Sequence, residues 1–133
     1  MHKFEQNVSV DVSIPPSATY TAAEEAGVGV DMAKYNNFAA IISVAGATQY
    51  QGALTCVIAE STDNSTFSDT FLATVTIASA TTDQVDTVEI RAEEMTDAYR
   101  FLRLEITPAA GTANIFSAEN VRFNPRYKSG SAL

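Results

Sequence analysis

The chain consists of short apolar segments separated by turn residues, and none of them repeats with the period of a long helix. Residues 8–14 alternate most clearly, with apolar side chains at Val8, Val10, Val12 and Ile14. A period of two is typical of a half-buried strand, and the prolines at 15–16 end it because proline cannot donate to a ladder. Further strands are predicted at residues 38–44, 54–60, 71–77, 88–90, 101–107 and 115–123. About seven to eight short strands without long helices between them predict an all-β fold, an antiparallel β-sandwich or jelly roll.

At most one or two short helical turns are expected beside these strands. Residues 22–26 fit either a helical turn ended by Gly27 or part of a long loop over residues 17–36. Residues 92–98 fit one further helical turn. Since no internal repeat divides the chain, we expect a single domain. Its parts would be an N-terminal strand or arm at 1–16, a sandwich body at 17–127 and a C-terminal tail at 128–133.

Residues 35–59 contain no charged side chain, and the stretch is long enough to cross a membrane. Several polar side chains interrupt it, however, and Gly46 and Gly52 bracket a polar loop. Two buried strands joined by a turn therefore explain it better than a membrane span. The first of them, at 38–44, is apolar on both faces and must be covered, because an exposed strand of this kind aggregates. We expect the stretch to lie in the sandwich core or at a contact between subunits.

The chain has one histidine, one cysteine and no tryptophan, so few residues are available for catalysis or metal binding. A zinc site needs clustered Cys and His, whereas His2 and Cys56 are alone in their kinds. Cys56 is expected to point inward as a small apolar residue. The segment around Asp63 lacks the ligand spacing and the glycine of a calcium loop, and it is better explained as a turn. We therefore predict a protein that is not an enzyme, with no catalytic residue, cofactor or metal.

The net charge of −8 is distributed unevenly, with −11 on residues 1–98 and +3 on residues 99–133. Nucleic acid is an unfavourable partner for an acidic body, because phosphate binding needs a basic surface. The C-terminal segment alone has the charge to contact an acidic surface. The simpler interpretation of Arg100 and Arg103 is that they lie on the outside of a strand and pair with nearby carboxylates.

Several segments together resemble small structural proteins encoded near the head genes of tailed bacteriophages. The resemblance covers roughly residues 28–127. It rests on a strand at 38–44, an "ESxDxSTF"-like turn at 60–67, a "YRFLRL"-like strand from Tyr99 and an "xPR" ending at Arg126. Asn64 stands where a glycine is common in that turn, but asparagine tolerates the left-handed conformation that the turn requires.

The resemblance implies a capsid decoration (cement) protein, which binds the outside of a phage head and stabilises contacts between major capsid subunits. It also implies a homotrimer located on the virion and assembled in the host cytoplasm, with the major capsid protein as partner and no nucleic acid or membrane involved. The surfaces expected to bind the partner are the N-terminal arm and the basic tail, and their candidate residues are Val8, Val10, Val12, Arg122, Arg126, Tyr127 and Lys128.

Two alternatives stay open. A neck or tail structural protein from the same gene neighbourhood would form six- or twelve-fold rings instead of three-fold assemblies. A carbohydrate-binding β-sandwich module would need an exposed aromatic platform, and its candidate members are Tyr20, Tyr35, Tyr50 and Tyr99.

Overall fold

The computed structural model describes residues 7–16, 20, 24–45, 52–78, 82–109 and 115–126. Within these ranges the chain forms nine strands and one turn of 3₁₀ helix. The strands are β1 (Val8–Ile14), β2 (Glu25–Ala26), β3 (Val30–Asp31), β4 (Tyr35–Val44), β5 (Leu54–Ser61), β6 (Ala73–Ile77), β7 (Gln84–Arg91), β8 (Phe101–Pro108) and β9 (Phe116–Pro125). The 3₁₀ turn η1 (Ala92–Glu94) lies where a helical turn was predicted. The all-β prediction is confirmed, and no helix in the described ranges is long and apolar enough to span a membrane.

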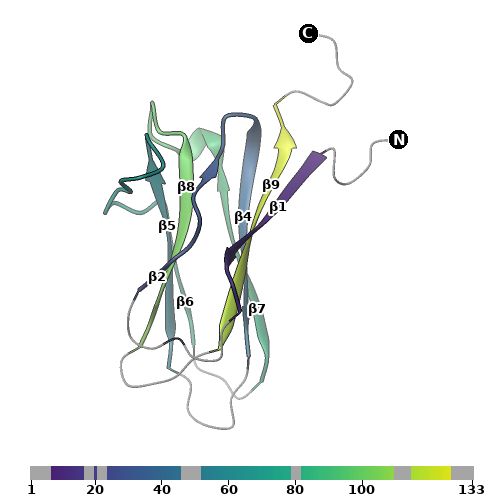
Figure 1. Cartoon of the computed structure of the whole chain (residues 1–133), viewed down its shortest axis with the longest axis vertical. Helices are drawn as coiled ribbons and strands as arrows, with labels where there is room; N and C mark the ends of the chain where they lie inside the picture. Colours follow the sequence, from purple (N-terminus) through teal and green to yellow (C-terminus); the bar gives the residue numbers. More distant parts are fainter. Residues whose placement is uncertain are drawn as a thin grey trace.

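The strands form two antiparallel sheets that face each other as the two layers of a sandwich (Figure 1). One sheet has the order β1-β9-β4-β7, and the other has the order β2-β8-β5-β6 with β3 also paired to β8. Strands β2 and β3 fall in the segment for which a helical turn or a loop was expected. The helical interpretation is therefore wrong for Glu25 and Ala26, which pair with Ile106 and Glu105 of β8. Residues 21–23 lie outside the described ranges.

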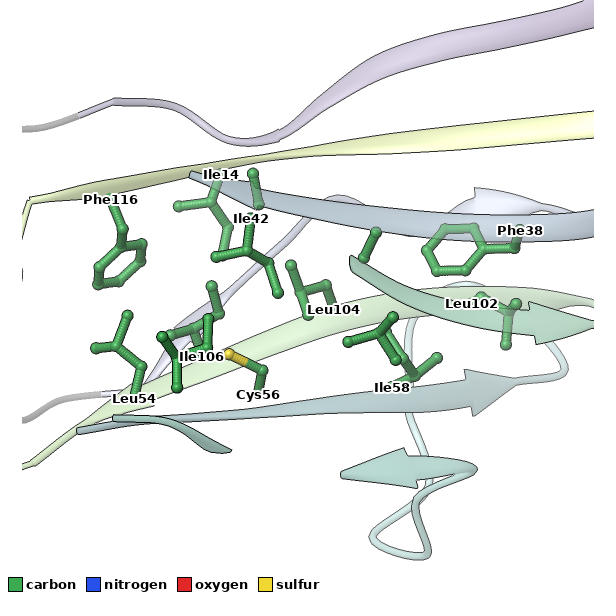
Figure 2. Close-up of a cluster of buried hydrophobic side chains, with 14 of the residues drawn as sticks. Ile14, Phe38, Ile42, Leu54, Cys56, Ile58, Leu102, Leu104, Ile106 and Phe116 are labelled. Atoms are coloured by element: carbon green, nitrogen blue, oxygen red, sulfur yellow. The ribbon is translucent and has the colours of Figure 1, made fainter. Parts of the chain in front are cut away.

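The core fills the space between the sheets with aliphatic and aromatic side chains (Figure 2). Most of its largest fully buried members come from β4, β5, β8 and β9, and Met32 joins them from the segment between β3 and β4. The members from the four strands include Phe38, Ile42, Leu54, Ile58, Leu102, Leu104, Ile106 and Phe116. The uncharged stretch thus supplies two core strands, as predicted for its described part. Cys56 is also fully buried, and burial raises the pKa of its thiol to about 12, so the expectation that it points inward is confirmed.

The turn after β5 is held by side-chain hydrogen bonds, as the sequence indicated. Asp63 Oδ1 accepts from the backbone N–H groups of Ser65 and Thr66, each at 2.9 Å. Asn64 has a φ of 59°, the left-handed conformation that asparagine tolerates. The turn is therefore explained by backbone capping, and no group of three or more metal-ligating side chains occurs in the described part of the chain.

Strand β1 is present where the alternation predicted it, but its faces are reversed. Val10 and Val12 are 52% and 59% exposed, whereas Ser13 is 3% exposed. The register pairs Val10 with Val121 and shifts between Val12 and Ile14, which is the mark of a β-bulge. The shift turns Ile14 into the core, where it is 2% exposed. Period two therefore identified the strand but not which face is buried.

Candidate interaction surface

Two neighbouring strands of the first sheet, β1 and β9, carry a group of apolar side chains on the face that points away from the second sheet. We call this group the valine face, and its members are Val8, Val10, Val12, Val121 and Phe123. The register sets Val8 opposite Phe123 and Val10 opposite Val121, so these four side chains are contiguous across both strands, whereas Val12 lies opposite the exposed Glu119. On the next strand, β4, Ala39 pairs with Val121 but is itself buried. Contiguous apolar surface of this kind commonly marks a contact with another protein.

The opposite face of the same two strands is polar and points toward the second sheet. We call it the polar seam, and its members are Ser9, Asp11, Ser13, Asn120 and Arg122. Arg122 Nη2 donates to Ser9 Oγ and to Asp11 Oδ2, each at 2.9 Å. Its Nη1 donates to the backbone oxygen of Asp31 at 3.0 Å. Arg122 therefore fixes β1 with its valines outward, because it binds the polar side chains of that strand from within.

Three buried atoms of the polar seam have no hydrogen-bond partner among the described residues. They are Ser13 Oγ, Asn120 Oδ1 and Arg122 Nε. Asn120 is fully buried and uses its Nδ2 to donate to the backbone oxygen of Val28 at 3.0 Å. Gly27 packs so closely here that a Cβ on it would lie 2.1 Å from Ser13 Oγ. Buried polar atoms are normally hydrogen-bonded, so ordered water is the expected partner in this seam.

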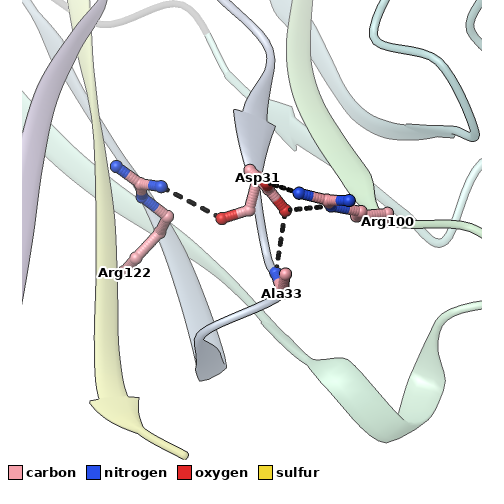
Figure 3. A network of polar contacts seen from close by, with 4 residues as sticks. All are labelled: Asp31, Ala33, Arg100 and Arg122. Atoms are coloured by element: carbon pink, nitrogen blue, oxygen red, sulfur yellow. Dashed lines mark hydrogen bonds and ion pairs between the residues drawn. The ribbon is translucent and has the colours of Figure 1, made fainter.

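An ion pair beside the seam ties β3 to the start of β8 (Figure 3). Arg100 Nε donates to Asp31 Oδ1 at 2.8 Å, and the backbone N–H of Ala33 donates to the same oxygen at 2.9 Å. The hydrogen bond from Arg100 is the main cause that lowers the pKa of Asp31. Arg103 also forms an ion pair, in which its Nε donates to Oε1 of Glu105 at 3.0 Å, two positions further along β8. The expectation that Arg100 and Arg103 pair with nearby carboxylates is confirmed.

Replacing Asp31 by asparagine is expected to make the stability of the protein less sensitive to acid. The pKa of Asp31 is lower in the folded chain than its ordinary value of 3.8. The ionised group therefore stabilises the fold above that value, and this contribution is lost as the pH falls through the lowered pKa. Melting temperatures of the wild type and the variant, measured from about pH 7 to about pH 2, should converge at the acid end. An undiminished difference at about pH 2 contradicts the assignment.

A cleft of about 390 Å³ opens between the polar seam and the Asp31 pair. Its lining includes two aspartates, Asp11 and Asp31, but each is bound by an arginine. Neither carboxylate is therefore arranged as a free general base. The cleft offers no nucleophile beside a base, and its charges are balanced internally.

The predicted partner-binding residues fall into three groups. Val8, Val10 and Val12 come together on the valine face, where Val121 and Phe123 join them. Arg122 points inward and is used within the chain. Arg126 is exposed, its side chain donates to the backbone oxygen of Tyr35 at 3.4 Å, and its backbone N–H donates to the oxygen of Lys34 at 2.9 Å. Tyr127 and Lys128 lie outside the described residues.

Val121 and Phe123 were not among the surface residues predicted from the sequence. The sequence did contain a signal, because Val121 and Phe123 are at odd positions of the strand and Phe116 and Ala118 at even ones. Side chains at odd and even positions face opposite sides of a sheet, and Phe116 and Ala118 are both 1% exposed. The tyrosines proposed as a sugar platform are dispersed where they are described. Tyr20 is buried and stacks on the ring of Phe116 with centroids 4.3 Å apart. Tyr35 lies under the guanidinium of Arg122, and Tyr50 lies outside the described ranges.

No model of a protein family and no curated protein sequence matches the chain. Several solved structures share its fold. The PBSX exported protein XepA superposes with a TM-score of 0.60 at 14% identity, over 94% of this chain and 42% of XepA. The chain thus spans less than half the length of that protein. A protein of the Bacillus endospore appendages, described as disulfide-linked pili, superposes with a TM-score of 0.54 at 14% identity. The match covers 89% of this chain and 88% of the appendage protein.

A chain from the structure of infectious bursal disease virus, Gx strain, gives a TM-score of 0.52 at 15% identity. It is matched over 91% of this chain and 33% of the viral chain. At such low identity these likenesses establish the architecture alone. The chain is a two-sheet antiparallel β-sandwich, a fold it shares with an exported protein, an appendage protein and a viral protein.

Proposed function

We propose that the protein is a structural component of a tailed-phage particle and acts as a capsid decoration protein. In this role it binds the outside of the head and stabilises contacts between major capsid subunits. The proposal is supported by the resemblance of residues 28–127 to small phage structural proteins. Virus and appendage proteins among the structures with the same fold are consistent with a protein that works within an assembly. A homotrimer at three-fold positions of the shell is part of the proposal.

The valine face is the observation that carries the proposal. Val10 and Val12 are more than half exposed, and they stand on a regular strand instead of a loop. A surface of β-branched side chains on a sheet is rigid, so little side-chain entropy is lost when a partner covers it. The partner surface should accordingly be apolar at its centre, with polar groups at its rim.

The chemistry of the described residues supports contact instead of catalysis. Cys56 is buried with a raised pKa, so it is a poor nucleophile. The aspartates of the cleft are paired with arginines, and no metal-ligating group is found in the described ranges. A non-enzymatic role is therefore part of the proposal.

Introducing charge on the valine face tests the proposal. The double variant Val10→Glu, Val12→Glu should fold, because both side chains are exposed, but its occupancy on purified heads should fall at least ten-fold. Burying even one unpaired carboxylate costs more than the roughly 1.4 kcal/mol that a ten-fold change represents. The matched control is Thr74→Glu, Thr76→Glu, which adds the same two charges on the exposed side of β6 in the other sheet. Occupancy is measured from band intensities of sedimented heads.

Full occupancy of the double variant, with circular dichroism like that of the wild type, contradicts docking through the valine face. Loss of occupancy in the Thr74→Glu, Thr76→Glu control as well indicates that added negative charge alone repels the protein from the head, and it likewise removes the support for this surface.

A further inference from the structure

Strand β1 is attached to the rest of the protein mainly by polar contacts. Of its residues, only Ile14 belongs to the buried apolar core cluster. Its remaining inward side chains belong to the polar seam, which contains three buried atoms without a partner among the described residues. Among the described strands it stands at the edge of its sheet beside β9, and its Ser13 oxygen also accepts from the backbone N–H of Val28 at 3.2 Å. Removing β1 therefore exposes little apolar surface, and the hydrophobic cost of its release is small.

From this arrangement we propose that β1 is exchanged between copies of the protein, so that β1 of one copy pairs with β9 of the next. The inference goes beyond the proposed function, because it concerns the assembly of the free protein and not its binding to a head. Exchange of an identical element is a low-cost route to an oligomer, since each contact of the closed copy is remade between copies. It is compatible with a ring of any number of copies, including three.

The edge of β9 specifies what can pair with it. Arg122 is 18% exposed in its side chain and needs an acceptor for its buried guanidinium. Asp11 supplies a carboxylate and Ser9 a hydroxyl at the required register, two residues apart on one face of the strand. The Asp11 side chain is 44% exposed, and Arg122 also donates to the backbone oxygen of Asp31, so a strand without a carboxylate there loses one ion pair and is disfavoured relative to β1. The β1 segment of a second copy has this carboxylate and hydroxyl, and it is therefore the strand expected to pair with β9.

The chain also has a defined hinge for the exchange. Pro15 and Pro16 follow β1 directly and are both exposed, and proline favours an extended, stiff backbone. Beyond them Tyr20 holds the chain to the body, because its hydroxyl donates to the backbone oxygen of Pro15 and its ring stacks on Phe116. The change in direction needed for exchange is thus placed at the junction of Ile14 and Pro15, immediately before the carbonyl that Tyr20 holds.

A disulfide across the β1–β9 pair distinguishes exchange from a closed copy. Val10 and Val121 are register partners, so cysteines at both positions are within bonding reach. The matched control is Ala39→Cys with Val121→Cys, a register pair of β4 and β9 that stays within one chain in either arrangement. Native Cys56 is fully buried and can remain in both variants. Unlabelled and ¹⁵N-labelled full-length chains are unfolded, mixed, refolded and then oxidised.

Exchange predicts that most of the Val10→Cys, Val121→Cys protein becomes covalent oligomers on a non-reducing gel. Mass spectrometry should find the disulfide joining a labelled strand to an unlabelled one. The control pair should close within single chains. If the β1–β9 pair also closes within single chains, the proposal is wrong. It is equally wrong if the single variant Val10→Cys gives as many covalent dimers as the double variant, because the β1 strands of two copies would then be joined to each other and not to β9. Head occupancy plays no part in this readout, so its failure leaves the proposed function standing.

Discussion

Replacing Phe38 by alanine should lower the free energy of unfolding by about 3–5 kcal/mol, the usual cost of deleting a large buried aromatic ring. Phe38 is fully buried at the centre of the first sheet, on a strand with a hydrogen-bonded neighbour on each side. The loss combines the transfer of the ring to water with a cavity that flanking strands cannot close. Urea unfolding followed by circular dichroism measures the effect.

Phe71→Ala is the matched control, because Phe71 is 41% exposed. Its expected cost is less than about 1 kcal/mol, as for surface substitutions generally. Equal losses in the two variants would mean that Phe38 does not lie in a closed core, and would contradict the packing of the sandwich.

Replacing Arg122 by methionine is expected to release β1, at a cost of about 2 kcal/mol, typical of hydrogen bonds to a charged group. Methionine keeps most of the apolar stem of the side chain but cannot bind Ser9 or Asp11. Hydrogen exchange should become faster at the amides of β1 while the amides of β4 keep their protection, since the two strands are not neighbours in the sheet.

Arg126→Met is the control for that variant, because the Arg126 side chain is exposed and its hydrogen bond to the oxygen of Tyr35 is long, 3.4 Å, while its backbone bond to Lys34 is kept. We expect a cost below about 0.5 kcal/mol from this change. Unchanged exchange at β1 in the Arg122 variant would show that the polar seam does not hold the strand.

The sequence predicted the central strands well because their pattern allows one solution. Leu102, Leu104 and Ile106 alternate with Arg103 and Glu105 in β8, and each of the three apolar residues is fully buried. The apolar run of β4 was expected to be covered on both faces. The second sheet covers its inner face, whereas Ile41 on the outer face is only half-buried in the described structure. Turn chemistry around Asp63 was equally local, since the hydrogen bonds span two or three residues.

The candidate surface was harder to predict, because alternation defines two faces without saying which one is buried. In β1 the polar face turns inward since Arg122, more than a hundred positions away in the chain, binds Ser9 and Asp11. A bulge before Ile14 then reverses the phase of the strand. The pairing of Asp31 with Arg100, also distant in sequence, has no local signal. Contacts of this range depend on the topology of the two sheets.

The most direct test of the decoration proposal is the symmetry of the protein's density in images of its native particle. The proposal predicts density on the outside of the head at three-fold positions, with the valine face turned toward the shell. Six- or twelve-fold density at the neck or tail would instead support the alternative structural role and contradict decoration. Absence of the protein from purified particles would contradict both.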